Sequence, residues 1–144
     1  MITIRTFSRE KVVGVDVSDR YVISISDIQP PPAFLTKPLS LLALTFCDDE
    51  EDFNSTYSPL DARHILDFAQ EALQQDKDLI VHCHAGISRS VAVALAIKDL
   101  LGPESVQKVL YDGMLEINSS TYSLYNKHVY STLRKVSYSD LYGD

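Results

Sequence analysis

Residues 81–90, Val-His-Cys-His-Ala-Gly-Ile-Ser-Arg-Ser, place a cysteine, a glycine and an arginine within a short segment. The apolar residues before it predict a buried strand, and the apolar spacing from Arg89 onward predicts a helix. A loop that leaves a strand and enters a helix N-terminus points several backbone N–H groups into one concavity, where the helix dipole adds positive potential. We therefore expect this loop to bind an anion.

Three side chains of the loop suit a phosphate ester in particular. Gly86 supplies the backbone freedom that a tight loop needs. The planar guanidinium of Arg89 can bind two phosphate oxygens at once, which a lysine cannot do equally well. Cys83 lies at the base of the same concavity, so the field that holds an anion also favours its thiolate. The expected chemistry is nucleophilic attack by Cys83 on phosphorus.

The first half of the chain is typical of short strands separated by polar turns. Three segments rich in β-branched or aromatic residues predict strands over 2–7, 21–25 and 41–46. Residues 29–32, Gln-Pro-Pro-Pro, cannot join a ladder and predict a stiff surface loop, which can also wall a cleft. The apolar run 79–81 predicts a strand covered on both faces, leading directly into Cys83.

Helices are expected after these strands. One begins after Ser58, because a serine N-cap is followed by a proline at the first helical position and by Asp61. Others are predicted over 89–101, where Gly102 and Pro103 end the helix, and over 104–111 and 122–136. In the last of these, one face should turn inward: Tyr122, Tyr125, Val129, Leu133 and Val136. The order predicts an α/β fold with a central, mostly parallel sheet flanked by helices.

Composition and charge limit the classes of partner. The 144 residues fit a single domain, with 137–144 as a polar, flexible tail. The net charge of −7 repels polyanions, so nucleic acid and anionic membranes are poor partners. No stretch approaches the roughly 18 unbroken apolar residues of a membrane span, and the first six residues lack a basic flank, so a cytoplasmic location is expected. The chain has two cysteines and is long enough to fold without a disulfide bond, which favours a reducing compartment.

The spacing His-Cys, two residues, Gly, two residues, Arg-Ser resembles the signature of the protein tyrosine and dual-specificity phosphatase superfamily, and every defining position matches. The preceding strand, the following helix and an upstream acidic loop extend the resemblance over about 21–136. The short chain is most similar to the compact dual-specificity branch, including bacterial and phage-type members. The resemblance implies hydrolysis of phosphotyrosine in a phosphorylated protein or a small phosphomonoester, and it leaves open whether phosphoserine and phosphothreonine are also substrates. No cofactor is expected, the absence of a paired ligand set predicts metal independence, and a monomer is the default.

The resemblance also implies roles for the loop residues. Cys83 would form a cysteinyl-phosphate intermediate while Arg89 holds the equatorial oxygens. His82 would support the thiolate from behind the loop, and Ser90 would ease its departure in the second step. The phosphate cradle would be completed by the backbone of the residues between: His84, Ala85, Gly86, Ile87 and Ser88.

The mechanism needs a proton donor for the leaving oxygen. The family takes it from an aspartate just after an upstream strand, and residues 46–53, Phe-Cys-Asp-Asp-Glu-Glu-Asp-Phe, occupy that place. Alternating apolar residues of the strand share one face: Leu42, Leu44 and Phe46. Continuing the period of two places Asp48 in line with them and points Asp49 the other way. Asp48 is therefore the first candidate and Asp49 the second. The Trp-Pro-Asp pattern of the longer tyrosine-specific enzymes is absent.

Other interpretations stay open. Cys83 between two histidines could begin a metal site completed by His64, His128 or Cys47, although no second ligand pair has the spacing of a zinc site. A sulfur-transfer or arsenate-reducing enzyme also presents Cys and Arg around an anion, but such enzymes usually lack the upstream acid. A module that captures phosphorylated partners without turnover needs neither nucleophile nor acid. Cys47 could pair with Cys83 under oxidation. A non-protein phosphomonoester is also possible, but the loop carries no lysine and no second arginine, which disfavours highly charged substrates.

Overall fold

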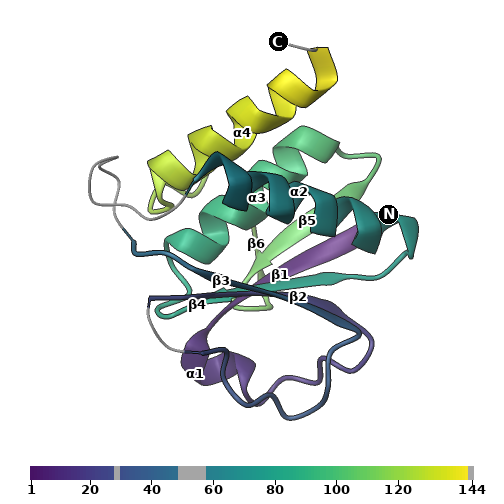
Figure 1. The fold of residues 1–144 in the computed structure, drawn as a ribbon. Helices are drawn as coiled ribbons and strands as arrows, with labels where there is room; N and C mark the ends of the chain where they lie inside the picture. Colours follow the sequence, from purple (N-terminus) through teal and green to yellow (C-terminus); the bar gives the residue numbers. More distant parts are fainter. Residues whose placement is uncertain (28–29, 49–57, 143–144) are drawn as a thin grey trace.

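A computed structural model describes residues 1–27, 30–48 and 58–142 of the chain, with side chains described as far as residue 135. Its centre is a six-stranded sheet (Figure 1). In chain order the strands are β1 Ile2–Ser8, β2 Tyr21–Ser26, β3 Ser40–Thr45, β4 Leu79–Cys83, β5 Val106–Tyr111 and β6 Leu115–Ile117. They lie in the order β3-β2-β4-β1-β5-β6, and all neighbours pair in parallel except β5 and β6. The predicted α/β class with a central, mostly parallel sheet is confirmed.

Helices cover the two faces of this sheet unequally. They are α1 Arg9–Val12, α2 Pro59–Gln74, α3 Arg89–Leu101 and α4 Lys127–Tyr142. In Figure 1, α2, α3 and α4 lie on one face, where they enclose the larger core, and α1 lies on the other. A smaller cluster on the α1 face joins Val12 and Val17 to Val22 and Ile80 of the central strands. Both β2 and β4 are therefore buried along their whole length, as the apolar run 79–81 predicts. Within the described ranges, no helix is long and apolar enough to cross a membrane.

The parallel pairing brings four strand ends to one edge of the sheet. Ser8 at the end of β1 is paired with Cys83 at the end of β4, and Ser24 of β2 is paired with His82. Ser26 of β2 is paired with Thr45 of β3. Ligands of open α/β sheets bind at the carboxyl ends of the strands. The residues that follow these four strands therefore lie around one place, with the predicted anion-binding loop at its centre.

The start of α2 follows the sequence prediction closely. Ser58 is the N-cap, its hydroxyl accepts a hydrogen bond from the Asp61 N–H at 3.3 Å, and an Asp61 carboxylate oxygen accepts one from the Ser58 N–H at 3.1 Å. This reciprocal capping box satisfies two of the free donors of the helix end. The buried face of α2 then packs into the larger core.

The helix predicted over 104–111 is wrong, because these residues contain strand β5. The pairing with β1 shifts register, so that Ile2 opposes Val106 while Thr3 opposes Lys108. One extra residue on β5 is accommodated at this bulge. Val106 and Val109 are consequently both buried at a spacing of three, which imitates the period of a helix.

The last helix is displaced from its predicted position. It starts at Lys127 instead of residue 122, and its backbone is helical to Tyr142 instead of ending at residue 136. Val129 and Leu133 are buried as predicted, whereas Tyr122 and Tyr125 pack against the core from the segment that precedes the helix. The side chain of residue 136 lies outside the described part. A flexible tail over 137–144 stays a prediction.

Candidate active site

The sulfur of Cys83 lies at the base of the loop that joins β4 to α3. Cys83 is the last residue of β4 and is 1% exposed. The Gly86 N–H donates a hydrogen bond to the sulfur at 3.3 Å, and the Ser90 hydroxyl oxygen lies 3.2 Å from it. Because α3 begins at Arg89, the sulfur faces the positive end of a helix of 13 residues. The sulfur therefore lies where backbone and side-chain polar groups of the loop meet the start of α3.

Gly86 is required at its position by conformation and by space. Its φ is +74°, and a Cβ there would lie 2.5 Å from the Ser8 nitrogen and 2.8 Å from the Phe7 carbonyl carbon. The loop is therefore pressed against the end of β1, where the Arg9 N–H also donates to the His84 carbonyl oxygen at 3.0 Å. A side chain at residue 86 would push the loop away from β1.

Arg89 is buried at the first turn of α3 and fixed from two sides. Its Nη1 donates to the Phe46 carbonyl oxygen at 2.7 Å and pairs with an Asp27 carboxylate oxygen at 2.7 Å. Its Nε is buried and has no hydrogen-bond partner among the described residues. Buried donors rarely stay unpaired, so an oxyanion in the loop would complete the bonding of this guanidinium. Asp27 was not among the residues that sequence reasoning selected, because nothing in its local sequence distinguishes it from a surface aspartate.

His82 lies behind the loop, fully buried within β4. Its Nε2 is 2.6 Å from the Ser24 hydroxyl oxygen, across the pairing of β2 with β4. Burial lowers the pKa of His82 to about 4, and the positive charges of Arg9 and Arg89 act in the same direction. His82 is therefore neutral at neutral pH.

Asp48 is joined to the loop although it lies 35 residues before Cys83 in the chain. One of its carboxylate oxygens, Oδ1, accepts hydrogen bonds from the Ser88 hydroxyl at 2.9 Å and from Nδ2 of Asn126 at 2.8 Å. The carboxylate itself is exposed. Asp49, the second candidate, lies outside the described residues.

Asn126 connects the start of α4 to both the loop and Asp48. It is fully buried, and its side-chain oxygen accepts from the Val129 N–H at 3.0 Å, in the manner of an N-cap. Its own backbone N–H donates to the Ser88 carbonyl oxygen at 3.2 Å. An asparagine before a helical pattern is a start signal. Sequence reasoning missed it, because the apolar spacing had placed the helix start at residue 122.

Tyr122 also contacts the loop between β4 and α3. Its hydroxyl donates to the Ile87 carbonyl oxygen at 2.8 Å. Burial, followed by the nearby Tyr111, raises the pKa of Tyr122 to about 12, so the hydroxyl keeps its proton. The sequence had suggested only a packing role for this residue.

Among the described residues, no group of three or more His, Cys, Asp or Glu side chains could hold a metal ion. His64 lies exposed on α2 and His128 lies on α4, so the structure does not gather the alternative metal ligands around Cys83. Cys47 is partly buried, and it forms no disulfide with Cys83.

The lowered pKa of His82 predicts a loss of stability in mild acid. The unfolded chain keeps a histidine pKa near 6.5, so it binds more protons than the folded chain between about pH 4 and 6.5. The contribution of the neutral His82 to the free energy of unfolding is complete above pH 6.5. It decreases as the pH falls, by up to about 3 kcal/mol. Urea unfolding of the protein and of His82→Gln from pH 7.5 to 4.5 measures it. The free-energy difference between the two should shrink with falling pH, and a constant difference would contradict the assignment.

No family model matches the sequence, and no curated protein matches it. Solved structures match its fold. Human DUSP28 superposes with a TM-score of 0.63 at 14% identity, over 98% of this chain and 95% of that one. The human tyrosine phosphatase-like serine/threonine/tyrosine-interacting protein gives 0.54 at 19% identity, over 85% and 78% of the two chains. A mouse protein assigned as a dual specificity phosphatase, complexed with zinc tungstate, gives 0.52 at 15% identity, over 85% and 73%. The chain therefore has the fold of the dual-specificity phosphatase-like branch of the protein tyrosine phosphatase superfamily.

Proposed function

We propose that this protein is a phosphatase that hydrolyses phosphotyrosine monoesters in proteins through a cysteinyl-phosphate intermediate. The observation that carries the proposal is the position of the Cys83 sulfur, which receives the Gly86 N–H at 3.3 Å inside a loop that opens onto the N-terminus of α3. A nucleophile, an anion site and a helix dipole coincide there. Activity on phosphoserine and phosphothreonine is the dual-specificity extension of the same chemistry, and a phosphopeptide panel measures it.

In the first step the phosphate group occupies the loop, where its oxygens are held by the backbone N–H groups and by Nε of Arg89, which has no partner among the described residues. The Cys83 thiolate attacks phosphorus, so that a sulfur–phosphorus bond forms while the bond to the ester oxygen breaks. The leaving oxygen takes a proton from the carboxylic acid of Asp48. In the second step water attacks phosphorus and gives its proton to Asp48, and the Ser90 hydroxyl hydrogen-bonds to the departing thiolate.

The contacts of Asp48 support its selection as the acid. Both hydrogen bonds from Ser88 and Asn126 reach the same oxygen, Oδ1, so Oδ2 is the oxygen available to carry the proton. The exposed carboxyl group is also accessible to a leaving group that approaches the loop from solvent. These contacts agree with the alternation of side chains along the strand, which predicts Asp48 on the same face as the buried residue Phe46.

Binding without turnover is the alternative, because one protein of this fold is named as an interacting protein. A pure binder has no use for a buried thiol held by two hydrogen-bonding groups or for a carboxyl group tied to the rim of the loop. Both features favour the enzyme.

Cys83→Ser should abolish hydrolysis of a generic aryl phosphate while tungstate binding remains. The cradle amides and Arg89 stay in place, but a serine hydroxyl in this environment is a poor nucleophile. Initial rates and calorimetric titration with tungstate measure the two properties on the same preparation. Substantial turnover by this variant would refute covalent catalysis by Cys83.

Asp48→Asn should lower kcat by roughly 10²-fold or more on substrates with poor leaving groups, because an amide cannot donate the required proton. The fall in rate at high pH should disappear with it, since that fall reports the ionisation of an essential acid. Asp49→Asn is the matched control and should have a much smaller effect. Rate profiles over pH for both variants decide the assignment, and the reverse order would make Asp49 the acid.

Asn126→Ala should lower kcat by about tenfold on poor leaving groups, through loss of the hydrogen bond that orients Asp48. A purely structural role would reduce activity equally whether or not Asp48 can act as an acid. The same substitution is therefore made in the Asp48→Asn background, where its effect on kcat should nearly vanish. Equal losses in the two backgrounds would show that Asn126 only supports the fold.

A further inference from the structure

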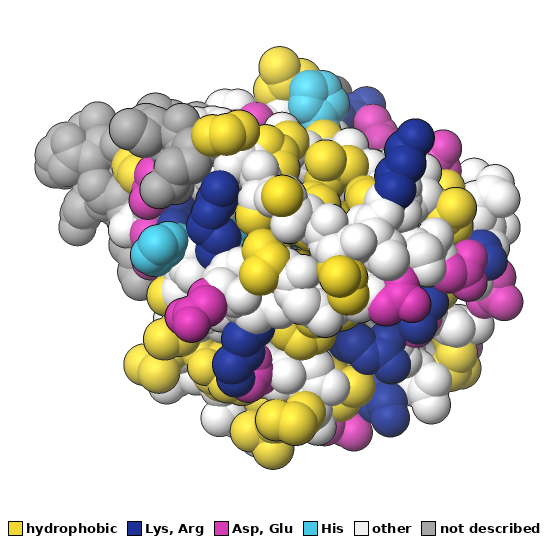
Figure 2. All heavy atoms as spheres, turned by 90° about the horizontal axis from the view of Figure 1, so that it is seen from below, with side chains coloured by type: hydrophobic (Ala, Val, Ile, Leu, Met, Phe, Trp, Pro, Cys, Tyr) yellow, Lys and Arg dark blue, Asp and Glu magenta, His cyan; other side chains and the backbone are white. Residues whose placement is uncertain are grey.

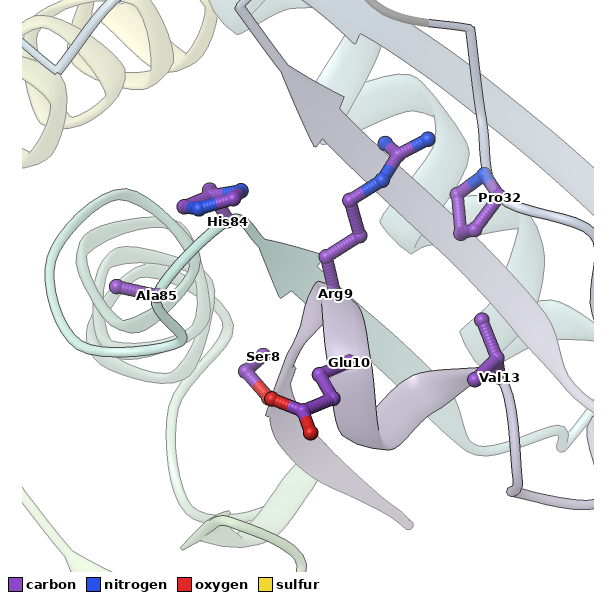
Figure 3. A pocket seen from close by; sticks show the side chains of 7 residues that line it. All are labelled: Ser8, Arg9, Glu10, Val13, Pro32, His84 and Ala85. Carbon is purple, nitrogen blue, oxygen red and sulfur yellow. The ribbon is translucent and has the colours of Figure 1, made fainter.

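A pocket of about 660 Å³ opens beside the Cys83 loop, on the same side of the sheet as α1 (Figure 3). It is lined by residues 8–10 from β1 and α1, by Val13 directly after α1, by Pro32, and by His84 and Ala85 at the rim of the loop. Cys83 does not line it, so the pocket adjoins the proposed phosphate site at His84 and Ala85 without reaching the sulfur. Its volume lies in the range of small-ligand pockets and suffices for a side chain or two.

Arg9 supplies the pocket with a fixed positive charge. Nη1 donates to the Ser26 hydroxyl at 3.1 Å, and Nη2 donates to the Pro30 carbonyl oxygen at 2.8 Å. Both acceptors are neutral, and in the described part of the chain Arg9 forms no ion pair with a carboxylate. A guanidinium has five N–H donors, so donors remain for an anion after these two bonds. Arg9 is thus held in place by neutral acceptors and has no carboxylate partner among the described residues.

The position of Arg9 relates the pocket to the reaction. Ser26, which holds its guanidinium, directly precedes Asp27, which holds the guanidinium of Arg89. The Arg9 backbone donates to the His84 carbonyl oxygen within the loop. The charges of Arg9 and Arg89 both act on His82. Substrate atoms that leave the loop over His84 and Ala85 would meet Arg9 in this pocket.

We infer that this pocket receives the residue next to the phosphorylated residue of a protein substrate, and that Arg9 selects an acidic side chain there. The inference rests on the proposed function and names its substrate class. The apolar surfaces of Val13, Pro32 and Ala85 would contact the aliphatic stem of the side chain, while its carboxylate meets Arg9 in a charge-assisted hydrogen bond. The proline run thus walls a cleft, one of the two roles that its sequence allows.

A densely charged lipid head group fits the pocket less well. Among the described residues that line it, Arg9 is the only lysine or arginine, and Glu10 lines it too. Figure 3 shows the Arg9 guanidinium and the Glu10 carboxylate pointing toward opposite ends. Figure 2 shows that positive and negative side chains are interspersed over this face of the molecule. A second phosphate would approach Glu10, whereas a single carboxylate can meet Arg9 alone.

The test compares phosphotyrosine peptides that differ at one neighbouring position. Glutamate is placed immediately before or immediately after the phosphotyrosine, with glutamine and lysine in matched peptides. For one of the two positions, kcat/KM with glutamate should exceed that with glutamine by about tenfold, and lysine should be worst. In Arg9→Gln the glutamate-to-glutamine ratio should fall to about one. Lys135→Gln, an equal loss of charge on exposed α4 across the sheet, should preserve the ratio.

Binding of the same peptides to Cys83→Ser, with and without Arg9→Gln, separates the inference from the proposed function. Hydrolysis by the wild type with no preference at either position would overturn the inference and leave the phosphatase intact. An Arg9-dependent preference in binding, with no hydrolysis of any peptide by the wild type, would support the pocket and refute the phosphatase. Phosphoinositide vesicles hydrolysed more efficiently than every peptide, with loss of that activity in Arg9→Gln, would overturn the assignment to peptides. If Arg9→Gln fails to fold, the ranking of glutamate, glutamine and lysine in the wild type still decides.

Discussion

The close approach of the loop to the end of β1 is the contact on which the rest of the site depends. Gly86 lies so near the Ser8 backbone that no side chain fits, and the Arg9 N–H holds the His84 carbonyl oxygen. This contact turns the Gly86 N–H toward the Cys83 sulfur and sets Arg9 beside the loop. It exists because β1 and β4 are parallel neighbours whose last residues, Ser8 and Cys83, are in register. If β1 were displaced by one residue, the Gly86 N–H and Arg9 would both move with it.

Arg89 and His82 are both buried at this edge of the sheet, and neighbouring protein groups determine which of them carries a charge. Arg89 is buried but has Asp27 and the Phe46 carbonyl oxygen as partners, which offsets the cost of removing a guanidinium from water. His82, equally buried, is kept neutral by the same burial and by the neighbouring arginines. Because His82 is neutral, the positive groups beside the loop are the Arg89 guanidinium and the N-terminus of α3, and no positive charge lies on the histidine behind the loop.

The strand, loop and helix around Cys83 could be predicted because their signals are local: an apolar run, a glycine and a helix start follow one another in the sequence. Asp48 could be placed from strand parity, since Leu44 and Phe46 are buried on one face as the alternation requires. Asp27 and Asn126 could not be found, because their roles arise from partners 62 and 78 residues away. The bulge in β5 could not be predicted from the sequence either, because the register shift depends on the pairing partner β1.

Asn126 shows why the C-terminal part of the chain belongs to the site although it carries no residue of the signature. One side chain caps α4 through the Val129 N–H and holds Asp48, while the backbone of the same residue holds Ser88. The position of the carboxyl group therefore depends on where α4 begins, and α4 in turn is placed by Val129 and Leu133 in the larger core. Packing of the helical layer is thus transmitted to the Asp48 carboxyl group through a single buried amide, whose side-chain oxygen and nitrogen are both hydrogen-bonded.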